Sequence, residues 1–222
     1  MLFNHMILND KTDIVPDVDQ VYVIDDDVSV RRSLYFLLAT AGFLSWPFAS
    51  ASDFLDNLPT LVPAPILLDV RMPHIDGIEL MALLSDQGIK WPVIVLTAYA
   101  DISIAVQATK LGAVEFLEKP CDFDMLEKSL RSAKLQLSII TNAEEAKSRS
   151  SKLFGLLSQR EIEVMAALAD GLSNKAAAHR LSISVRTVEM HRANALNKLN
   201  VRSVAEVLRL ANEAGLRLDD RT

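Results

Sequence analysis

The sequence predicts an α/β chain, in which a doubly wound, five-stranded parallel sheet is followed by a small all-α domain of four helices. The first observation is a set of short apolar runs at 21–24, 66–68, 93–96 and 114–117, which alternate with helical patterns at 28–41, 52–58, 78–85 and 102–111. Such alternation requires parallel strands that are joined by right-handed crossovers. The second observation is that the back part has helical periodicity and no strand signal.

The charges of the chain are unevenly distributed, although the net charge is only −6. Residues 1–130 contain 8 Lys/Arg and 19 Asp/Glu, whereas residues 131–222 contain 15 and 10. An acidic front and a basic back indicate two modules. The basic module is compatible with nucleic acid, because phosphate neutralisation supplies most non-specific affinity. We expect one domain at 19–130, a helical linker at 131–152 and a second domain at 153–222.

The linker begins with apolar residues at helical spacing, namely Leu126, Leu130, Ala133, Leu137 and Ile140. We interpret this seam as the last helix of the front domain continuing into the linker, with the domain boundary in the polar stretch 141–151. Two alternatives stay open. The helix could simply pack on its own sheet, or the seam could pair two subunits, although about two heptads are too few to establish a coiled coil.

Polar residues follow the predicted strands at the points where the strands end: Asp25 and Asp26, then Asp69, then Thr97, then Lys119. The carboxyl ends of parallel strands line one crevice, so these side chains should meet. Three neighbouring carboxylates repel one another unless a cation joins them, and Mg²⁺ with oxygen ligands suits the group. Asp69 would then be free to attack a phosphoryl group and form an aspartyl phosphate, with Lys119 and the Thr97 hydroxyl contacting the phosphoryl oxygens.

Several of these residues also have ordinary structural interpretations. Asp27 is typical of a helix N-terminus, because acidic residues favour the first turn. Thr97 and Lys119 taken singly are common surface residues, and Cys121 is interpreted as structural or incidental. No apolar run approaches the roughly 18 residues that a membrane-spanning helix needs, and residues 1–20 lack the pattern of a signal peptide. We therefore expect a cytoplasmic protein without a membrane partner.

The back part should contain helices at 158–169, 174–181, 185–199 and 203–212. Ser158 and Glu161 have capping-box spacing, and Asn174 and Ser184 are suitable N-caps for the next two helices. The short turn at 182–184 makes the second and third helices a candidate helix-turn-helix.

The third of these helices has two different faces. Val185, Val188, Ala195, Leu196 and Leu199 recur at helical spacing and should face the core. The opposite face carries Arg186, Thr187, Glu189, Met190, Ala193, Asn194 and Asn197. Such a face suits a DNA major groove, while a merely solvated polar face is the alternative. Arg192 lies nearer the core side, where it would reach a phosphate or pack its stem.

The front part resembles the receiver domain of bacterial two-component response regulators. The motifs that carry the resemblance are Ile24-Asp25-Asp26-Asp27, Leu68-Asp69-Val70-Arg71-Met72-Pro73, Leu96-Thr97-Ala98 and Glu118-Lys119-Pro120. The resemblance implies that Asp69 is the phosphoacceptor, and that Asp25 and Asp26 bind Mg²⁺ together with the Arg71 backbone carbonyl. It also implies that Thr97 and Lys119 contact the phosphoryl group, that the bond before Pro120 is cis, and that Phe116 is the switch aromatic.

The back part resembles the LuxR-type DNA-binding domain. The matching motifs are Leu157-Ser158-Gln159-Arg160-Glu161, Ala169-Asp170-Gly171-Leu172-Ser173-Asn174-Lys175 and Arg186-Thr187-Val188-Glu189-Met190-His191-Arg192. The resemblance implies that 185–199 is the recognition helix and that Lys175 lies near the DNA backbone. His191 is expected to be structural or a phosphate contact. The two domains together resemble transcriptional response regulators of the FixJ or NarL type.

Two classes of function follow. In the first, a sensor histidine kinase phosphorylates Asp69, and the receiver then dimerises or releases the DNA-binding domain, so that a homodimer binds promoter DNA, with RNA polymerase as a further partner. In the second, the front domain is a phosphohydrolase with an aspartyl-phosphate intermediate. The attached DNA-binding domain, and Arg71 in place of an acid two residues after Asp69, argue against an enzyme. Phosphorylation-independent regulation is a third, weaker alternative.

Overall fold

The computed structural model describes residues 19–98 and 101–218. Its front part is a five-stranded sheet in the order β2-β1-β3-β4-β5, and every neighbouring pair is parallel. The predicted fold class is thus confirmed. The strands are β1 (Asp19–Ile24), β2 (Phe43–Phe48), β3 (Ile66–Leu68), β4 (Val93–Thr97) and β5 (Glu115–Glu118).

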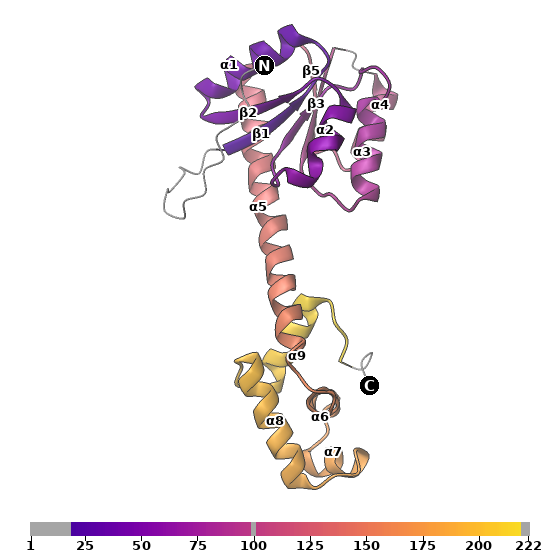
Figure 1. Cartoon of the computed structure of the whole chain (residues 1–222), viewed down its shortest axis with the longest axis vertical. Coiled ribbons are helices and arrows are strands. Elements are labelled where there is room, and N and C mark those ends of the chain that lie inside the picture. Colours follow the sequence, from indigo (N-terminus) through magenta and orange to yellow (C-terminus); the bar gives the residue numbers. More distant parts are fainter. Residues whose placement is uncertain (1–18, 99–100, 219–222) are drawn as a thin grey trace. The chain divides into compact units, whose positions relative to one another are not determined.

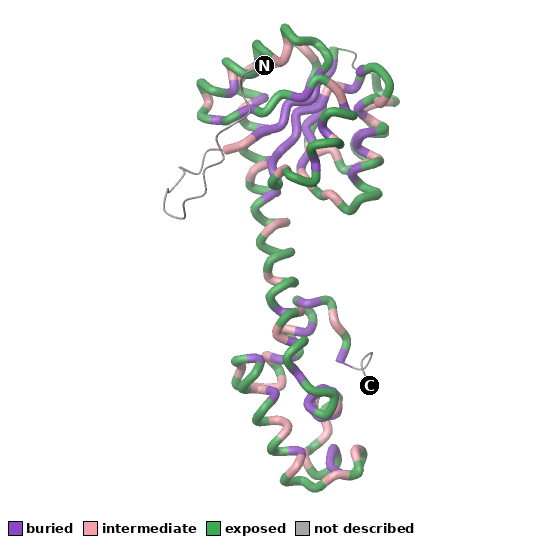
Figure 2. Tube along the Cα trace, in the orientation of Figure 1, coloured by how far each residue is buried: buried purple, intermediate pink, exposed green. Residues whose placement is uncertain are grey.

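Helices cover both faces of this sheet (Figure 1). They are α1 (Val28–Thr40), α2 (Ala51–Asn57), α3 (Gly77–Asp86), α4 (Ile102–Lys110) and the first part of α5 (Phe123–Phe154), with a short 3-10 turn at Leu58–Thr60. Alternate residues of each strand point to opposite faces. Tyr22 and Ile24 therefore lie in the core beneath α2, α3 and α4, while Val21 and Val23 lie in the core beneath α1 and α5. Figure 2 shows the strands as the most continuously buried segments.

Strand β2 is the element that no apolar run in the sequence revealed. It lies at the sheet edge, where Leu44 and Trp46 are exposed, and it contains Pro47, which cannot donate to a ladder. An edge strand needs no continuous apolar run, because one side of it faces solvent. Its presence is therefore a property of the folded sheet, and its Phe43 and Phe48 contribute to the two opposite cores.

Helix α5 is a single helix of 32 residues that continues through the polar stretch 141–151. The chain divides into two compact units between Ser138 and Ile139, within this helix. In the first unit, the seam residues Leu126, Leu130 and Ala133 are fully buried against the sheet. This observation supports the alternative in which the helix packs on its own sheet, because these side chains are not available to a second subunit.

The second unit is entirely helical over the residues that the structure describes. It contains the last turns of α5 together with α6 (Gln159–Ala169), α7 (Asn174–Arg180), α8 (Val185–Leu199) and α9 (Val204–Ala214). Four apolar positions that hold it together are Phe154, Met165, Leu199 and Val207. No helix in the described residues has the length and hydropathy to cross a membrane.

The helix caps largely follow the sequence. Ser158 and Glu161 form the predicted capping box, and Ser184 caps α8. The N-cap of α7 is Ser173, however, which accepts from the Ala176 backbone N–H, so the assignment of Asn174 was wrong by one residue. Ser173 has the extended backbone that an N-cap requires, whereas Asn174 is already helical.

Candidate phosphoryl-transfer site and nucleic-acid interface

The predicted polar residues meet at the carboxyl edge of the sheet. Asp25 directly follows β1, Asp69 follows β3, Thr97 ends β4 and Lys119 follows β5. Two backbone hydrogen bonds hold neighbouring strand ends in register: Asp69 N–H donates to the Ile24 carbonyl at 2.9 Å, and Lys119 N–H donates to the Thr97 carbonyl at 2.8 Å. The parallel sheet thus brings together four segments that are far apart in the sequence.

Three carboxylates form an acidic cluster at this edge. Carboxylate oxygens of Asp25, Asp26 and Asp69 lie within 4.8 Å of one another. Asp25 is buried, Asp69 is half-buried and Asp26 is exposed to solvent. A buried cluster with one open side fits Mg²⁺, which prefers oxygen ligands and keeps several of its waters. The donor set of these residues therefore fits the metal that the sequence predicted.

Lys119 is the cation that the structure places in this cluster. Its Nζ lies 2.5 Å from Asp25 Oδ2 and 3.3 Å from Asp69 Oδ1. Burial raises the pKa of Asp69, and the charge of Asp25 raises it further, while Lys119 opposes both effects. The pKa of Asp69 lies above its ordinary value overall, and the ammonium group of Lys119 lies where a phosphoryl group on Asp69 would carry its charge.

Backbone and side-chain donors that the sequence did not single out hold Asp25 in place. Arg31 Nη1 donates to the Asp25 carbonyl at 2.5 Å, and the Asp27 N–H donates to Asp25 Oδ1 at 2.9 Å. Asp27 itself is the N-cap of α1, since its carboxylate accepts from the Ser29 N–H at 2.7 Å. Its structural interpretation is confirmed. Arg31 lies one turn into α1, so only its spacing from Asp25 could have indicated this contact.

Gly77 allows the loop after β3 to fold back against Asp69. A Cβ atom at this position would lie 2.4 Å from the Asp69 carbonyl oxygen and 2.9 Å from Val70 Cα. The Gly77 N–H donates to the Val70 carbonyl at 2.8 Å, and the following helix begins with a capping box between Asp76 and Glu79. The sequence does not indicate this role of Gly77, because the close approach involves a segment eight residues away.

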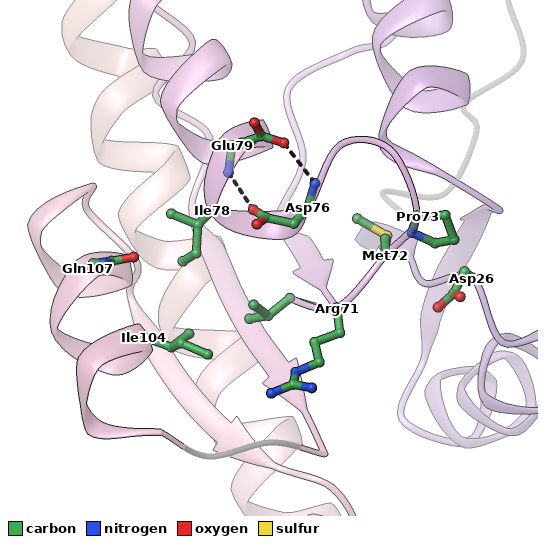
Figure 3. Close-up of a pocket in the computed structure, with 10 residues that line it drawn as sticks. Asp26, Arg71, Met72, Pro73, Asp76, Ile78, Glu79, Ile104 and Gln107 are labelled. Carbon is green, nitrogen blue, oxygen red and sulfur yellow. Dashed lines mark hydrogen bonds between the residues drawn. The ribbon is translucent and has the colours of Figure 1, made fainter.

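A cavity of about 580 Å³ lies beside the acidic cluster (Figure 3). Ile78 of α3 and Ile104 of α4 line one side of it, and Asp26 lies on the other side. Arg71, whose backbone carbonyl is the predicted metal ligand, also lines this cavity. Its positive charge contributes to lowering the pKa of Asp101, behind the larger effect of hydrogen bonds from Ser103.

The two predicted switch residues occupy the neighbouring strands β4 and β5. Thr97 is fully buried. Phe116 pairs with Val95 across the ladder, and its half-buried ring packs against the core beneath α2, α3 and α4. The Lys119–Pro120 peptide bond is cis, as the resemblance implied.

The predicted recognition helix α8 separates core and solvent residues. Val188, Ala195 and Leu199 are buried and Leu196 is half-buried, whereas the opposite face exposes Arg186, Glu189, Met190 and Asn194. Val185, which was expected in the core, is 40% exposed. It is the first residue of the helix, beyond the reach of the core that Val188 enters.

Three further predicted DNA contacts differ in accessibility. Lys175 on α7 is exposed. Arg192 is half-buried, in keeping with its position nearer the core side. Thr187 is half-buried too, and its hydroxyl lies 2.7 Å from the hydroxyl of the N-cap Ser184. The Thr187 side chain therefore stabilises the start of α8, in addition to any contact that it makes with DNA.

Two family models match the chain, one for each unit. Residues 21–131 match the response regulator receiver domain. Residues 155–211 match the bacterial regulatory proteins of the luxR family. The first match covers every strand except the start of β1, and the second covers α6, α7, α8 and most of α9.

Curated relatives align with this chain over most of their own length. The transcriptional regulatory protein FixJ of Bradyrhizobium diazoefficiens is 43% identical over 196 residues, which are 88% of this chain and 96% of that protein. The transcriptional regulatory protein TdiR of Thauera aromatica is 37% identical and covers 85% of this chain and 83% of that protein. Both relatives are named as regulators of transcription.

Solved structures agree with the sequence comparisons. The response regulator StyR is 37% identical with a TM-score of 0.80, over 88% of this chain and 98% of that one. Full-length FixJ from B. japonicum is 43% identical with a TM-score of 0.55, over 89% and 97%. The chain therefore belongs to the FixJ-like response regulators of two-component systems, which regulate transcription through a receiver domain and a LuxR-type DNA-binding domain.

Proposed function

We propose that Asp69 is the phosphoacceptor through which a sensor histidine kinase controls this regulator. The observation that carries the proposal is the position of the Asp69 carboxylate, which lies beside Asp25 and Asp26 and 3.3 Å from Lys119 Nζ. A carboxylate in such a cluster combines a nucleophilic oxygen with a nearby cation. This combination suits the formation of an aspartyl phosphate.

The proposed step transfers a phosphoryl group from a phosphohistidine of the kinase. A carboxylate oxygen of Asp69 forms a bond to phosphorus while the phosphorus–nitrogen bond breaks, and the imidazole retains the electron pair of that bond. Lys119 stabilises the charge on the phosphoryl oxygens, and the buried Thr97 hydroxyl offers a hydrogen bond to one of them. The phosphoryl group carries roughly 1.5 to 2 negative charges, but the carboxylate of Asp69 gives up its own charge, so the edge of the sheet gains at most about one negative charge.

Asp25, Asp26 and Asp69, with the Arg71 backbone carbonyl, would hold Mg²⁺ in this site. Bound there, the ion supplies positive charge that offsets the carboxylates and the incoming phosphate. Hydrogen bonds within the protein fix the positions of two of these carboxylates. Asp25 accepts from Arg31 and from the Asp27 N–H, and the Asp69 N–H donates to the Ile24 carbonyl.

Phosphorylation of the full chain by acetyl phosphate and Mg²⁺ tests the proposal, with intact mass as the readout. We expect one phosphoryl adduct on the wild type and none on Asp69→Asn. Asp86→Asn, a change at the exposed end of α3, is the matched control and should keep the adduct. An adduct on Asp69→Asn would reject the assignment of Asp69.

The same measurement distinguishes a switch from an enzyme. A regulator should retain a single adduct over the course of the experiment, whereas a phosphohydrolase would consume acetyl phosphate in many turnovers. Arg71 occupies the position two residues after Asp69, where a general acid would be needed. We therefore propose that the receiver is not an enzyme. Rapid multiple turnover would contradict this proposal.

We further propose that α8 enters the major groove of promoter DNA. Arg186, Glu189, Met190 and Asn194 are exposed on one face of the helix, opposite the buried Val188 and Ala195. Thr187 and Arg192 lie at the margins of this face, and Lys175 is on the preceding helix. Side chains near the N-terminus of such a helix reach base edges, while cations at its margins contact phosphates.

Arg186→Ala tests this interface in a salt titration of DNA binding. We expect weaker binding and a salt slope that is smaller by about one, because one phosphate contact is lost. Arg160→Ala is the matched control, since Arg160 is exposed on α6 and pairs with Glu163 of the same helix. An unchanged salt slope would remove Arg186 from the phosphate contacts.

The active form is proposed to be a cytoplasmic homodimer that recruits RNA polymerase. Two copies on paired half-sites about one helical turn apart would bind more tightly than one, through their effective concentration. Sedimentation of the chain before and after treatment with acetyl phosphate tests dimerisation. A monomer in both states would reject it.

A further inference from the structure

Two carboxylates in the described ranges 19–98 and 101–218 are buried, and each is paired with a lysine. Asp25 belongs to the phosphoryl-transfer site. Glu161 lies in the second unit, with its side chain 4% exposed, and belongs neither to that site nor to the exposed face of α8. A buried charge is costly unless it is paired and hydrogen-bonded. The partners of Glu161 therefore indicate what it does.

Glu161 joins the beginning of α6 to the last turn of α8. Its Oε2 accepts from Lys198 Nζ at 2.8 Å and from the Ser158 backbone N–H at 2.7 Å. The Glu161 N–H in turn donates to Ser158 Oγ at 3.3 Å. One carboxylate oxygen thus connects a helix start, which is fixed by its capping box, with a residue 37 positions further along the chain.

This ion pair adds a directional contact to the apolar packing of α8. Near its start, α8 is held by Val188 against Val164 and Ala177. Near its end it is held by Ala195 and Leu199. The apolar part of this packing is non-directional. A hydrogen-bonded ion pair at the last turn adds a contact whose geometry is specific.

The protonation state of Glu161 agrees with this geometry. Burial acts to raise the pKa of Glu161, but the hydrogen bond from Lys198 and those with Ser158 outweigh burial and hold the pKa below its ordinary value. Glu161 is therefore ionised at neutral pH. At neutral pH, Lys198 therefore pairs with a negatively charged carboxylate.

We propose that Glu161 is a positioning residue of the DNA-binding domain, which acts through Lys198 to fix the C-terminal end of α8. The direction in which Arg186 and Met190 leave the helix is thereby fixed. This inference rests on the proposed role of α8 in the major groove. The ion pair between Glu161 and Lys198 then contributes to the discrimination between DNA sequences, in addition to the stability of the domain.

A double-mutant cycle of Glu161→Gln and Lys198→Met in the full chain tests the inference. Glutamine can still accept from the Ser158 N–H, so the capping box is kept while the charge is removed. Binding is measured to a duplex that the wild-type chain selects from a random-sequence library and to a scrambled duplex, at a temperature where circular dichroism shows every variant folded. We expect each single change to weaken selected-duplex binding about tenfold, with little effect on the scrambled duplex, and the double change to cost no more than either single change.

The surface pair Arg160–Glu163 on the same helix is the matched control. Arg160→Gln and Glu163→Gln alter an ion pair within α6 that does not reach α8, so they should leave the ratio of selected to scrambled binding unchanged. Amide hydrogen exchange adds a structural readout. In Glu161→Gln we expect faster exchange in the last turn of α8, but not around Val188.

Three outcomes would overturn the inference. Lower melting temperatures with unchanged discrimination would make the pair purely structural. Tighter binding with a steeper salt slope in Glu161→Gln would mean that the pair withholds Lys198 from DNA phosphates. Weakening by Lys198→Met alone would make Lys198 a direct contact. If the wild type selects no duplex even after treatment with acetyl phosphate and Mg²⁺, the proposed DNA interface itself fails, which is a distinguishable result.

Discussion

The acidic cluster at the carboxyl edge of the sheet combines opposing charges within a few ångströms. Asp25 is buried and held by Arg31, Asp27 and Lys119, whereas Asp26 is exposed. Substitutions of Asp25 and of Asp26 should therefore have different effects on the protein. A change at Asp25 disturbs its hydrogen bonds within the protein, while a change at Asp26 removes a charge and leaves the packing intact.

Asp26→Asn should therefore weaken stabilisation by Mg²⁺ strongly without unfolding the protein. A ligand that binds only the folded state stabilises it by about 2.7 kcal/mol at one hundred times its dissociation constant. We expect Mg²⁺ to raise the melting temperature of the wild type and of the Asp86→Asn control, but to raise that of Asp26→Asn much less. An equal rise in all three would exclude Asp26 as a ligand.

Gly77→Ala should impair phosphorylation as well as stability. The added methyl group would lie 2.4 Å from the Asp69 carbonyl oxygen, so the backbone of the acceptor must shift. Gly88→Ala is the control, because Gly88 has a positive φ of 72° but open space around its Cβ position. Its cost is backbone strain alone, about 1 kcal/mol. Both variants should unfold at lower denaturant concentration, but only Gly77→Ala should form the acetyl-phosphate adduct more slowly. Equal adduct rates would contradict the proposed role of Gly77.

At the scale of elements, α5 contributes to both units. Its first turns bury Leu126 and Leu130 against the sheet, and its last turns bury Phe154 in the core of the DNA-binding domain. Ser150 is buried as well, and its Oγ donates to Glu213 Oε2 of α9 at 3.5 Å. The chain divides into the two units between Ser138 and Ile139. This division precedes the polar stretch 141–151, in which we expected the domain boundary from the sequence.

Two fragments of the DNA-binding domain test which part of α5 this domain needs. Fragment 153–222 lacks Ser150 and leaves Phe154 at a frayed terminus, whereas fragment 139–222 keeps four helical turns before it. We expect 139–222 to be more stable by at least about 1 kcal/mol in urea unfolding, because ends without packing open readily. Both should bind DNA at low temperature. Equal stability would place the domain boundary near 153, as first expected.

At the scale of the whole molecule, α5 is the covalent and helical connection between the receiver domain and the DNA-binding domain. Gln136 and Ile139, near the middle of α5, are exposed, although Leu137 between them is buried. A change there can alter the helix while leaving both ends in their own cores. Regulation is then expected to depend on the continuity of the helix, because no other chain segment links the two units.

Gln136→Pro should separate phosphorylation from regulation. Proline in a helix interior removes a backbone hydrogen bond and costs about 3 kcal/mol or more. We expect the variant to form the Asp69 adduct at the wild-type rate but to lose the dependence of DNA binding on acetyl phosphate. Gln136→Ala, which favours the helix, should behave like the wild type. Unchanged regulation in Gln136→Pro would reject a rigid helical connection.

Local patterns were sufficient for much of this protein. The polar residues at the strand ends, the capping box at Ser158 and the N-cap Ser184 depend on neighbours within a few positions, so their sequence spacing is informative. The parallel sheet follows in the same way from alternating strands and helices. Family resemblance then implied features that spacing could not supply, such as the cis peptide bond before Pro120.

Other features required the folded chain. Strand β2 exists because a sheet edge accepts half-exposed residues, and Val185 is exposed because the first turn of α8 extends past the core. The contacts of Gly77 with Asp69 and of Glu161 with Lys198 join segments whose sequence separation carries no periodic signal. Periodicity reports which face of an element is apolar. It does not report which distant side chain that element will meet, and packing alone determines those pairs.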